Sequence, residues 1–450
     1  MSGGAGRVGW VLSAGVLALL VGCGGKDSAS TTAPADAAWR MVTQEPCQGR
    51  VQDMVVRPIM PVARPVQGGT YRDPAFGTFI TRVTAVSTAE GENAVLKPMY
   101  STMPAWNADE SLLILWHRGK GHELYEGEEP YRFLKSLPIA PTDIEHVLWD
   151  PVDPDVFYYP SGYNNVPTLV KYQVGRAGRP DSTTVLRDFS TAPTNCPTGD
   201  RSSRFGLGAD PEWMSFGPRK LLGLMCGATG YIKFVYSITE DRVIAGAPTT
   251  GIGPITTIPA PSELLVYLGG GWVFDTDLRL QRRLTAESYF EHSNVGRSAR
   301  GYDTWNAVAF DESSPGANDV GALITHRLDT GEHKVVIGPA TGYPYPPSST
   351  HISSIALKAP GWVAVGMVGV HQGTSVLDNE IVLANVDTGQ VCRVAHARTF
   401  AGTTSDGRWD YWSETHLNLS PSGTRVLWGS DWMNGPSVDT YVVDLRKVPR

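Results

Sequence analysis

The sequence lacks the features that are typical of helical proteins and of nucleic-acid-binding proteins. After residue 40 it contains no apolar stripe at helical spacing, which excludes a helical bundle. The formal net charge is −7, and this acidic balance argues against nucleic acid as a partner. What is present is a chain of 450 residues with 49 glycines and 33 prolines, in which short alternating apolar runs dominate. Such a pattern is typical of an all-β protein with frequent turns.

The one long apolar run is an N-terminal targeting segment. Arg7 precedes the run VGWVLSAGVLALLVG, which is too short and too weakly flanked for an ordinary membrane span. The run ends in LVGC, Leu20 to Cys23, which resembles the bacterial lipoprotein signal. This resemblance implies cleavage before Cys23, lipid on Cys23 and membrane contact through that lipid. A plain signal peptide with an incidental cysteine is the alternative.

The residue after the cysteine bears on the compartment. Gly24 stands where an inner-membrane retention signal would place aspartate. By resemblance, we therefore expect an exported outer-membrane lipoprotein that faces the periplasm or the cell surface.

A short pattern recurs along the rest of the chain: a strand opening, a turn and a second apolar strand. The template is ETHLNLSPSGTRVLWGSDW, which begins at Glu414 and opens its first strand at His416. The other copies open at, or lie near, six residues: Tyr100, His146, Glu212, Ile255, His292 and His351. Two more strands follow each pair, and four strands per unit predict an all-β, seven-bladed β-propeller.

The ring is expected to close through an N-terminal strand. The last unit has only three strands and ends at Tyr441 to Leu445, whereas the strand Phe76 to Val86 precedes the first unit unpaired. We therefore expect Phe76 to Val86 to be the outermost strand of the last blade, which leaves no open edge. The hairpins resemble those of exported propellers with TolB-like or WD40-like blades, a resemblance that specifies a fold and not a function.

This organisation divides the chain into four parts. We expect a signal peptide over residues 1–22, a flexible tether over 23–38, an N-terminal extension over 39–75 and the propeller over 76–450.

Most histidines are predicted to gather on one face. In each blade the innermost strand begins on what we call the top face, which also carries the loop after strand two and the loop that enters the blade. Seven of the ten histidines fall there: His117, His122, His146, His292, His351, His371 and His416. A histidine at a strand start is often a packing residue, and this interpretation stays open for the set.

Three of these histidines open neighbouring blades and are predicted to share one ion. They are His292, His351 and His416, and a carboxylate such as Glu212 would complete the set. Neutral imidazoles with a carboxylate suit a divalent metal such as Mn or Zn.

The loops that enter the blades carry aromatic rings, which suit sugars, and guanidinium groups, which suit carboxylates. The candidates for substrate binding are Tyr343, Tyr345, Arg408, Trp409, Tyr411 and Trp412.

The top face resembles the sites of two families of propeller polysaccharide lyases. Oligogalacturonate lyases carry a histidine-rich manganese site on the channel, although their closely spaced glutamine and histidine ligands have no match here and they are typically cytoplasmic. Exported ulvan lyases use two histidines, a tyrosine and an arginine. The second resemblance implies His122 and His146 as a catalytic pair and Arg204 as a clamp for the substrate carboxylate, with the tyrosine unassigned.

These features predict an envelope-anchored propeller that binds an acidic polysaccharide at a histidine-rich channel mouth and cleaves it by β-elimination. The alternative is a non-catalytic propeller that binds a glycan or an envelope protein. The sequence names neither the sugar nor the partner.

Cysteine is scarce, and four of the five cysteines lie after Cys23. Their spacing is unlike a zinc site, and outside the cytosol they can form disulfides. Cys196 enters the third blade and Cys226 ends its second strand, so both are top-face positions of one unit and we predict a bridge between them. The pairing of Cys47 and Cys392 is left open.

Overall fold

The structure is a computed structural model and describes most of the chain. The described residues are 39–162, 166–196, 204–206, 214–227, 232–248, 257–268, 271–284, 292–308, 322–343, 351–367, 373–400 and 410–450. The signal segment, Cys23 and the tether therefore lie outside them. None of the helices in this described part is long and apolar enough to cross a membrane.

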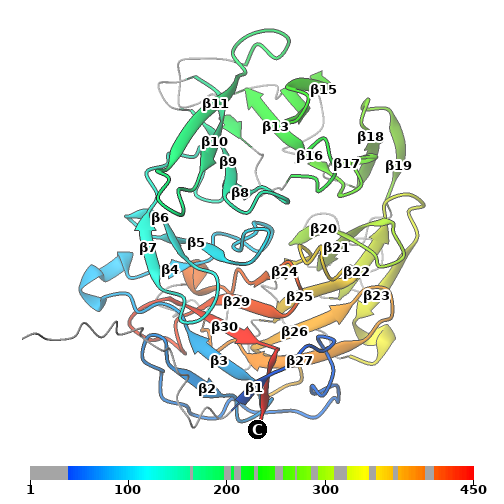
Figure 1. The fold of residues 1–450 in the computed structure, drawn as a ribbon. Helices are drawn as coiled ribbons and strands as arrows, with labels where there is room; N and C mark the ends of the chain where they lie inside the picture. Colours follow the sequence, from blue (N-terminus) through cyan, green and yellow to red (C-terminus); the bar gives the residue numbers. More distant parts are fainter. Residues whose placement is uncertain are drawn as a thin grey trace, which may run out of the picture.

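Seven antiparallel blades form a propeller ring (Figure 1). Each of the first six is a four-stranded sheet in chain order from the innermost strand outward. The strands of blades one to three are β4 (Leu96–Lys97), β5 (Leu112–His117), β6 (Gly121–Glu126), β7 (Phe133–Ser136); β8 (Leu148–Trp149), β9 (Val156–Ser161), β10 (Thr168–Gln173), β11 (Ser182–Asp188); and β12 (Arg204–Gly206), β13 (Leu221–Gly227), β14 (Ile232–Ser237), β15 (Arg242–Pro248). Those of blades four to six are β16 (Thr257–Pro259), β17 (Leu265–Leu268), β18 (Trp272–Asp275), β19 (Leu280–Arg283); β20 (Ser293–Arg297), β21 (Asp303–Val308), β22 (Leu323–Arg327), β23 (His333–Ile337); and β24 (His351–Ser353), β25 (Trp362–Met367), β26 (Glu380–Asn385), β27 (Val391–His396).

The seventh blade closes the ring by combining the two ends of the propeller. Its strands are β28 (Asn418–Leu419), β29 (Arg425–Ser430), β30 (Asp439–Asp444), β3 (Phe79–Arg82) and β2 (Thr70–Arg72). The N-terminal strand β3 pairs with β30, as predicted. It is not the outermost strand, because β2 pairs along its other edge.

Short turns set the hairpins of the blades. The turn Ser420–Pro–Ser–Gly423 joins β28 to β29, and Asp387–Thr–Gly389 joins β26 to β27. Gly423 and Gly389 have φ of 71° and 79°, a left-handed conformation that costs glycine little. The remaining regular segments of the described chain are the 3-10 turns η1 (Thr88–Asn93), η5 (Pro339–Thr341) and η6 (Asp410–Ser413) and the pair β1 (Trp39–Met41) and β31 (Lys447–Pro449).

Neighbouring blades are joined by packing and by buried acids. One apolar cluster, for example, combines Leu383 of the sixth blade with Trp428 and Ile80 of the seventh. On the face opposite the top, Glu110 of the first blade accepts hydrogen bonds from Arg425 and Ser422 of the seventh. Asp387 likewise accepts from Ser298 in the neighbouring fifth blade. A buried carboxylate is tolerated because donors of the next blade satisfy it.

Residues 39–69 form a segment along the outside of blades six and seven, which we call the strap. A disulfide between Cys47 and Cys392 fixes the strap to β27, with 5.5 Å between the Cα atoms. Further along the strap, the carbonyl oxygens of Arg57, Met60 and Val62 accept hydrogen bonds from the side chains of His396, Arg398 and Trp432, respectively. A second disulfide joins Cys196 and Cys226, the pair predicted from the sequence, with 5.6 Å between the Cα atoms.

A candidate metal site at the channel mouth

Three histidines from the starts of neighbouring innermost strands converge on the top face. His292 precedes β20, His351 opens β24 and His416 precedes β28. The ring of His351 stacks on His292 at 4.1 Å between centroids and meets His416 edge-on at 4.5 Å. The ring symmetry of the fold therefore brings together side chains that are spread over residues 292 to 416 of the sequence.

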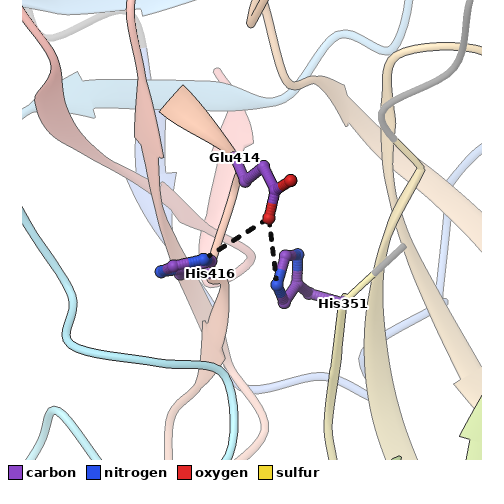
Figure 2. A group of neighbouring side chains, drawn as sticks. All are labelled: His351, Glu414 and His416. Carbon is purple, nitrogen blue, oxygen red and sulfur yellow. Dashed lines mark ion pairs between the residues drawn. The ribbon is translucent and has the colours of Figure 1, made fainter. Parts of the chain in front are cut away.

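The carboxylate beside them is Glu414. An oxygen of Glu414 lies 3.5 Å from Nε2 of His351 and 3.6 Å from Nε2 of His416 (Figure 2). One ligand atom from each of these three residues lies within 4.8 Å of the others. Ligands bound to a metal at about 2.0–2.2 Å lie about 3–4 Å apart, so only a small contraction would enclose an ion. His292 stands beside this group through its contact with His351.

The imidazoles of His351 and His416 are in the neutral form that can bind a metal. Nδ1 and Nε2 of His351 and Nε2 of His416 are buried and have no hydrogen-bond partner in the described part of the chain. Burial, then His292, His416 and Lys97, hold the pKa of His351 well below its usual range. Burial, Lys97 and His292 do the same to the pKa of His416. Both imidazoles are thus neutral at pH 7, the form in which histidine binds metals.

The backbone and a lysine hold the segment that carries Glu414. His416 has φ of 36°, a strained conformation for a side-chain-bearing residue, and its Nδ1 faces the carbonyl oxygen of Met99 at 3.3 Å. Nζ of Lys97 donates to the carbonyl oxygens of Trp412 (3.0 Å) and Glu414 (2.8 Å). Burial lowers the pKa of Lys97 to about 7, against the opposing effect of the carboxylates of Glu414 and Glu145.

Glu414 was not among the residues predicted for the site. The sequence suggested Glu212 as the carboxylate, and Glu212 lies outside the described residues. The signal for Glu414 was its place two residues before His416, at a strand start already singled out.

The predicted catalytic pair lies on the same face but in the packing of blades one and two. Nε2 of His122 donates to the carbonyl oxygen of Ile144 at 2.7 Å, and Nδ1 of His146 contacts the hydroxyl of Thr142 at 3.0 Å. Burial lowers the pKa of both histidines, that of His146 to about 4. Their catalytic role stays a prediction, as does that of Arg204, whose side chain lies outside the described part.

One of the predicted substrate-binding aromatics, Tyr411, lies next to the histidines, and Trp412 lies beside Tyr411. The ring of Tyr411 is 5.0 Å from that of His416 and is 44% exposed, and its hydroxyl donates to Glu145 at 3.4 Å. Trp412 instead stacks on Trp116 at 5.1 Å. Of these two rings, that of Tyr411 is the more exposed.

Of the other substrate-binding candidates, the structure describes only Tyr343. Tyr343 is half-buried against the apolar cluster that the fifth and sixth blades share. Tyr345, Arg408 and Trp409 fall outside the described residues.

His117, at the end of β5, is clamped between two carboxylates. Its Nδ1 lies 2.8 Å from Glu123 and its Nε2 2.8 Å from Glu90 of η1, so both nitrogens donate. Burial alone would lower the pKa of His117, but the bonds to Glu123 and Glu90 outweigh burial and raise it. The clamp thus holds η1 to β5 through a protonated imidazole.

This clamp should make stability depend on pH. Because the folded pKa of His117 is raised, its contribution to the free energy of unfolding is complete below the unfolded pKa of about 6.5 and is lost as pH rises through the folded value. We expect the stability difference between the native protein and His117→Gln, measured by urea unfolding, to be largest near about pH 6 and to shrink toward about pH 9. A difference that stays constant or grows over this range would show that the bonds to Glu90 and Glu123 do not depend on the proton.

Comparison with known proteins finds similarity in structure only. No family model and no curated protein sequence matches the chain. Two similar solved structures are an oligogalacturonate lyase in complex with manganese, with a TM-score of 0.56 and 12% identity, and an oligogalacturonate lyase from Vibrio parahaemolyticus, with a TM-score of 0.52 and 13% identity. Each alignment covers 84% of this chain and 96% of the other chain. At this identity the likeness establishes the seven-bladed propeller fold and not the activity.

Proposed function

We propose that the chain is a metal-dependent lyase that cleaves an acidic polysaccharide by β-elimination at the top face. One observation carries the proposal: two buried nitrogens without hydrogen bonds, from His351 and His416, lie 3.5 and 3.6 Å from one carboxylate, that of Glu414. The donor set of two neutral imidazoles and a carboxylate fits a divalent ion such as manganese or zinc. The manganese complex of a structurally similar lyase supports this choice of cofactor.

β-Elimination needs three contributions in the same place: stabilisation of charge on the substrate carboxylate, a base for the C5 proton and a proton donor for the departing oxygen. The proton at C5 of a uronic acid leaves only when the charge on the adjacent carboxylate is stabilised, and a bound ion supplies that stabilisation. His351, His416 and Glu414 would hold the ion, and the exposed ring of Tyr411 would face the sugar beside them.

Residues of the top face other than the three metal ligands would transfer the protons. We propose that a neutral imidazole, His122 or His146, accepts the C5 proton as the C4–O bond breaks and the C4=C5 bond forms. Burial, then Glu145 and Glu414, raise the pKa of Tyr411, so its hydroxyl keeps its proton and can donate it to the departing oxygen.

The proposal is tested by adding the metal-free protein and Mn²⁺ to polygalacturonate, alginate and ulvan. We expect ultraviolet absorbance from the unsaturated product on at least one of these polymers, its loss with a chelator and its return with excess Mn²⁺. Dextran, which has no carboxylate, is the control and should give no signal. Tight metal binding with no product from any acidic polymer would instead favour a binding protein.

The proposal includes the envelope location expected from the signal at Leu20 to Cys23. The disulfides of the described chain support an oxidising compartment. Membrane fractionation tests it: Cys23→Ala should move the protein to the soluble fraction, and an unchanged membrane association would contradict lipid attachment at Cys23.

A further inference from the structure

A buried lysine beside the histidines has no role in the chemistry above. Lys97 lies in β4, the innermost strand of the first blade, and is 1% exposed. Lysine is almost never fully buried unless it is paired. Here its Nζ donates 3.0 and 2.8 Å hydrogen bonds to the main-chain carbonyls of Trp412 and Glu414, across the junction between the first and the seventh blade.

These bonds fix the short segment that carries the carboxylate. Residues 410–413 form η6, and the amide of Glu414 donates to the carbonyl of Tyr411 at 3.2 Å. From the other side, the hydroxyl of Thr399 in the sixth blade donates to the carbonyl of Ser413. The main chain at Glu414 is therefore held by contacts from both neighbouring blades.

We propose that Lys97 is a positioning residue for the metal site and holds the backbone of Glu414 so that its carboxylate points between His351 and His416. The inference rests on the proposed function, because it takes these three residues as the ligands. Figure 2 shows the geometry that would depend on Lys97: one Glu414 oxygen faces both rings. Lys97 acts through Glu414 and is not itself a ligand.

Two effects of Lys97 on metal binding have opposite signs. Its ammonium group repels a divalent cation, so removing the charge should strengthen binding. Removing it also leaves two partly buried carbonyls without their donor, and the segment would shift to satisfy them. The sign of the change in affinity therefore decides whether positioning or repulsion dominates.

The experiment is a double-mutant cycle read out by calorimetric titration of the metal-free protein with Mn²⁺ and Zn²⁺. We expect Lys97→Met and Glu414→Gln each to weaken binding by about 10–100-fold. The double variant should bind within about 2-fold of Glu414→Gln, because a residue that acts through Glu414 has no further effect once the carboxylate is gone. The visible spectrum of bound Co²⁺ should change in Lys97→Met as it does in Glu414→Gln.

Lys447→Met is the matched control. Lys447 is also 1% exposed and bonds to Glu129, away from the histidines, so its loss should lower stability and leave metal affinity unchanged. If Lys97→Met does not fold, Lys97→Gln takes its place. Its shorter amide should also fail to reach the two carbonyls, so the same loss of affinity is expected.

The outcomes separate the inference from the proposed function. Native-like or tighter binding by the Lys97 variant, or losses that multiply in the double variant, overturns the positioning role while leaving the metal site intact. A native protein that binds none of these ions contradicts the proposed function and the positioning role together.

Discussion

Replacing His351 with alanine should abolish tight binding of divalent ions and, with it, the proposed lyase activity. His351 is fully buried and contacts both His292 and His416, so its loss removes one of three ligands and a ring that packs on two other histidines. We expect affinity for Mn²⁺ to fall by more than about 100-fold, beyond what the loss of an outer-shell partner usually causes. Titration calorimetry on the metal-free proteins measures this change.

The same variant should leave the metal-free fold almost as stable as before. A large-to-small change in a packed core costs about 2–5 kcal/mol, but both nitrogens of His351 are buried without a hydrogen bond, and removing such a group recovers about 1–3 kcal/mol each. His396→Ala is the control, because His396 is buried outside the site and donates to the carbonyl of Arg57. It should lower stability while metal affinity stays native. A large loss of stability in His351→Ala with unchanged metal binding would mean that His351 is a packing residue.

Removing the disulfide between Cys47 and Cys392 should cost more stability than removing the one between Cys196 and Cys226. The first closes a loop across 345 residues and the second across 30. In the chain-entropy model these loops correspond to about 5–6 and about 3–4 kcal/mol. Double serine variants of each pair, compared by urea unfolding, measure the two losses. The opposite order, or no loss on removing the bridge between Cys47 and Cys392, would contradict loop closure as the source of its stabilising effect.

The blade architecture could be predicted because each blade repeats a local signal. Hairpin turns such as Asp387 to Gly389 and the alternating apolar strands around them specify strands without help from distant residues. The strand β2 was missed because Thr70–Arg72 is too short to show an alternation. Its pairing with β3 depends on the tertiary structure and not on a local sequence signal.

The metal candidates could be predicted in part for the same reason. His292, His351 and His416 occupy equivalent positions in neighbouring blades, and ring symmetry then requires them to approach. Glu414 and Lys97 gave no repeating signal, because each occurs in one blade and acts through the junction between blades. Burial of Lys97 in particular could not be read from the sequence, in which a lysine is normally taken as exposed. The packing of Trp412 on Trp116 could not be read from the sequence either, since it depends on the first blade.

The pairing of β1 with β31 places the N-terminal end of the described chain on the face opposite the histidines. β28 runs away from the top face, β29 returns and β30 runs away again, so β31 and its partner β1 follow from the far end of the channel. Trp39, the first described residue, therefore lies on the side remote from His351 and His416. A support attached ahead of Trp39 would therefore meet the far end of the ring, with His351 and His416 on the opposite face.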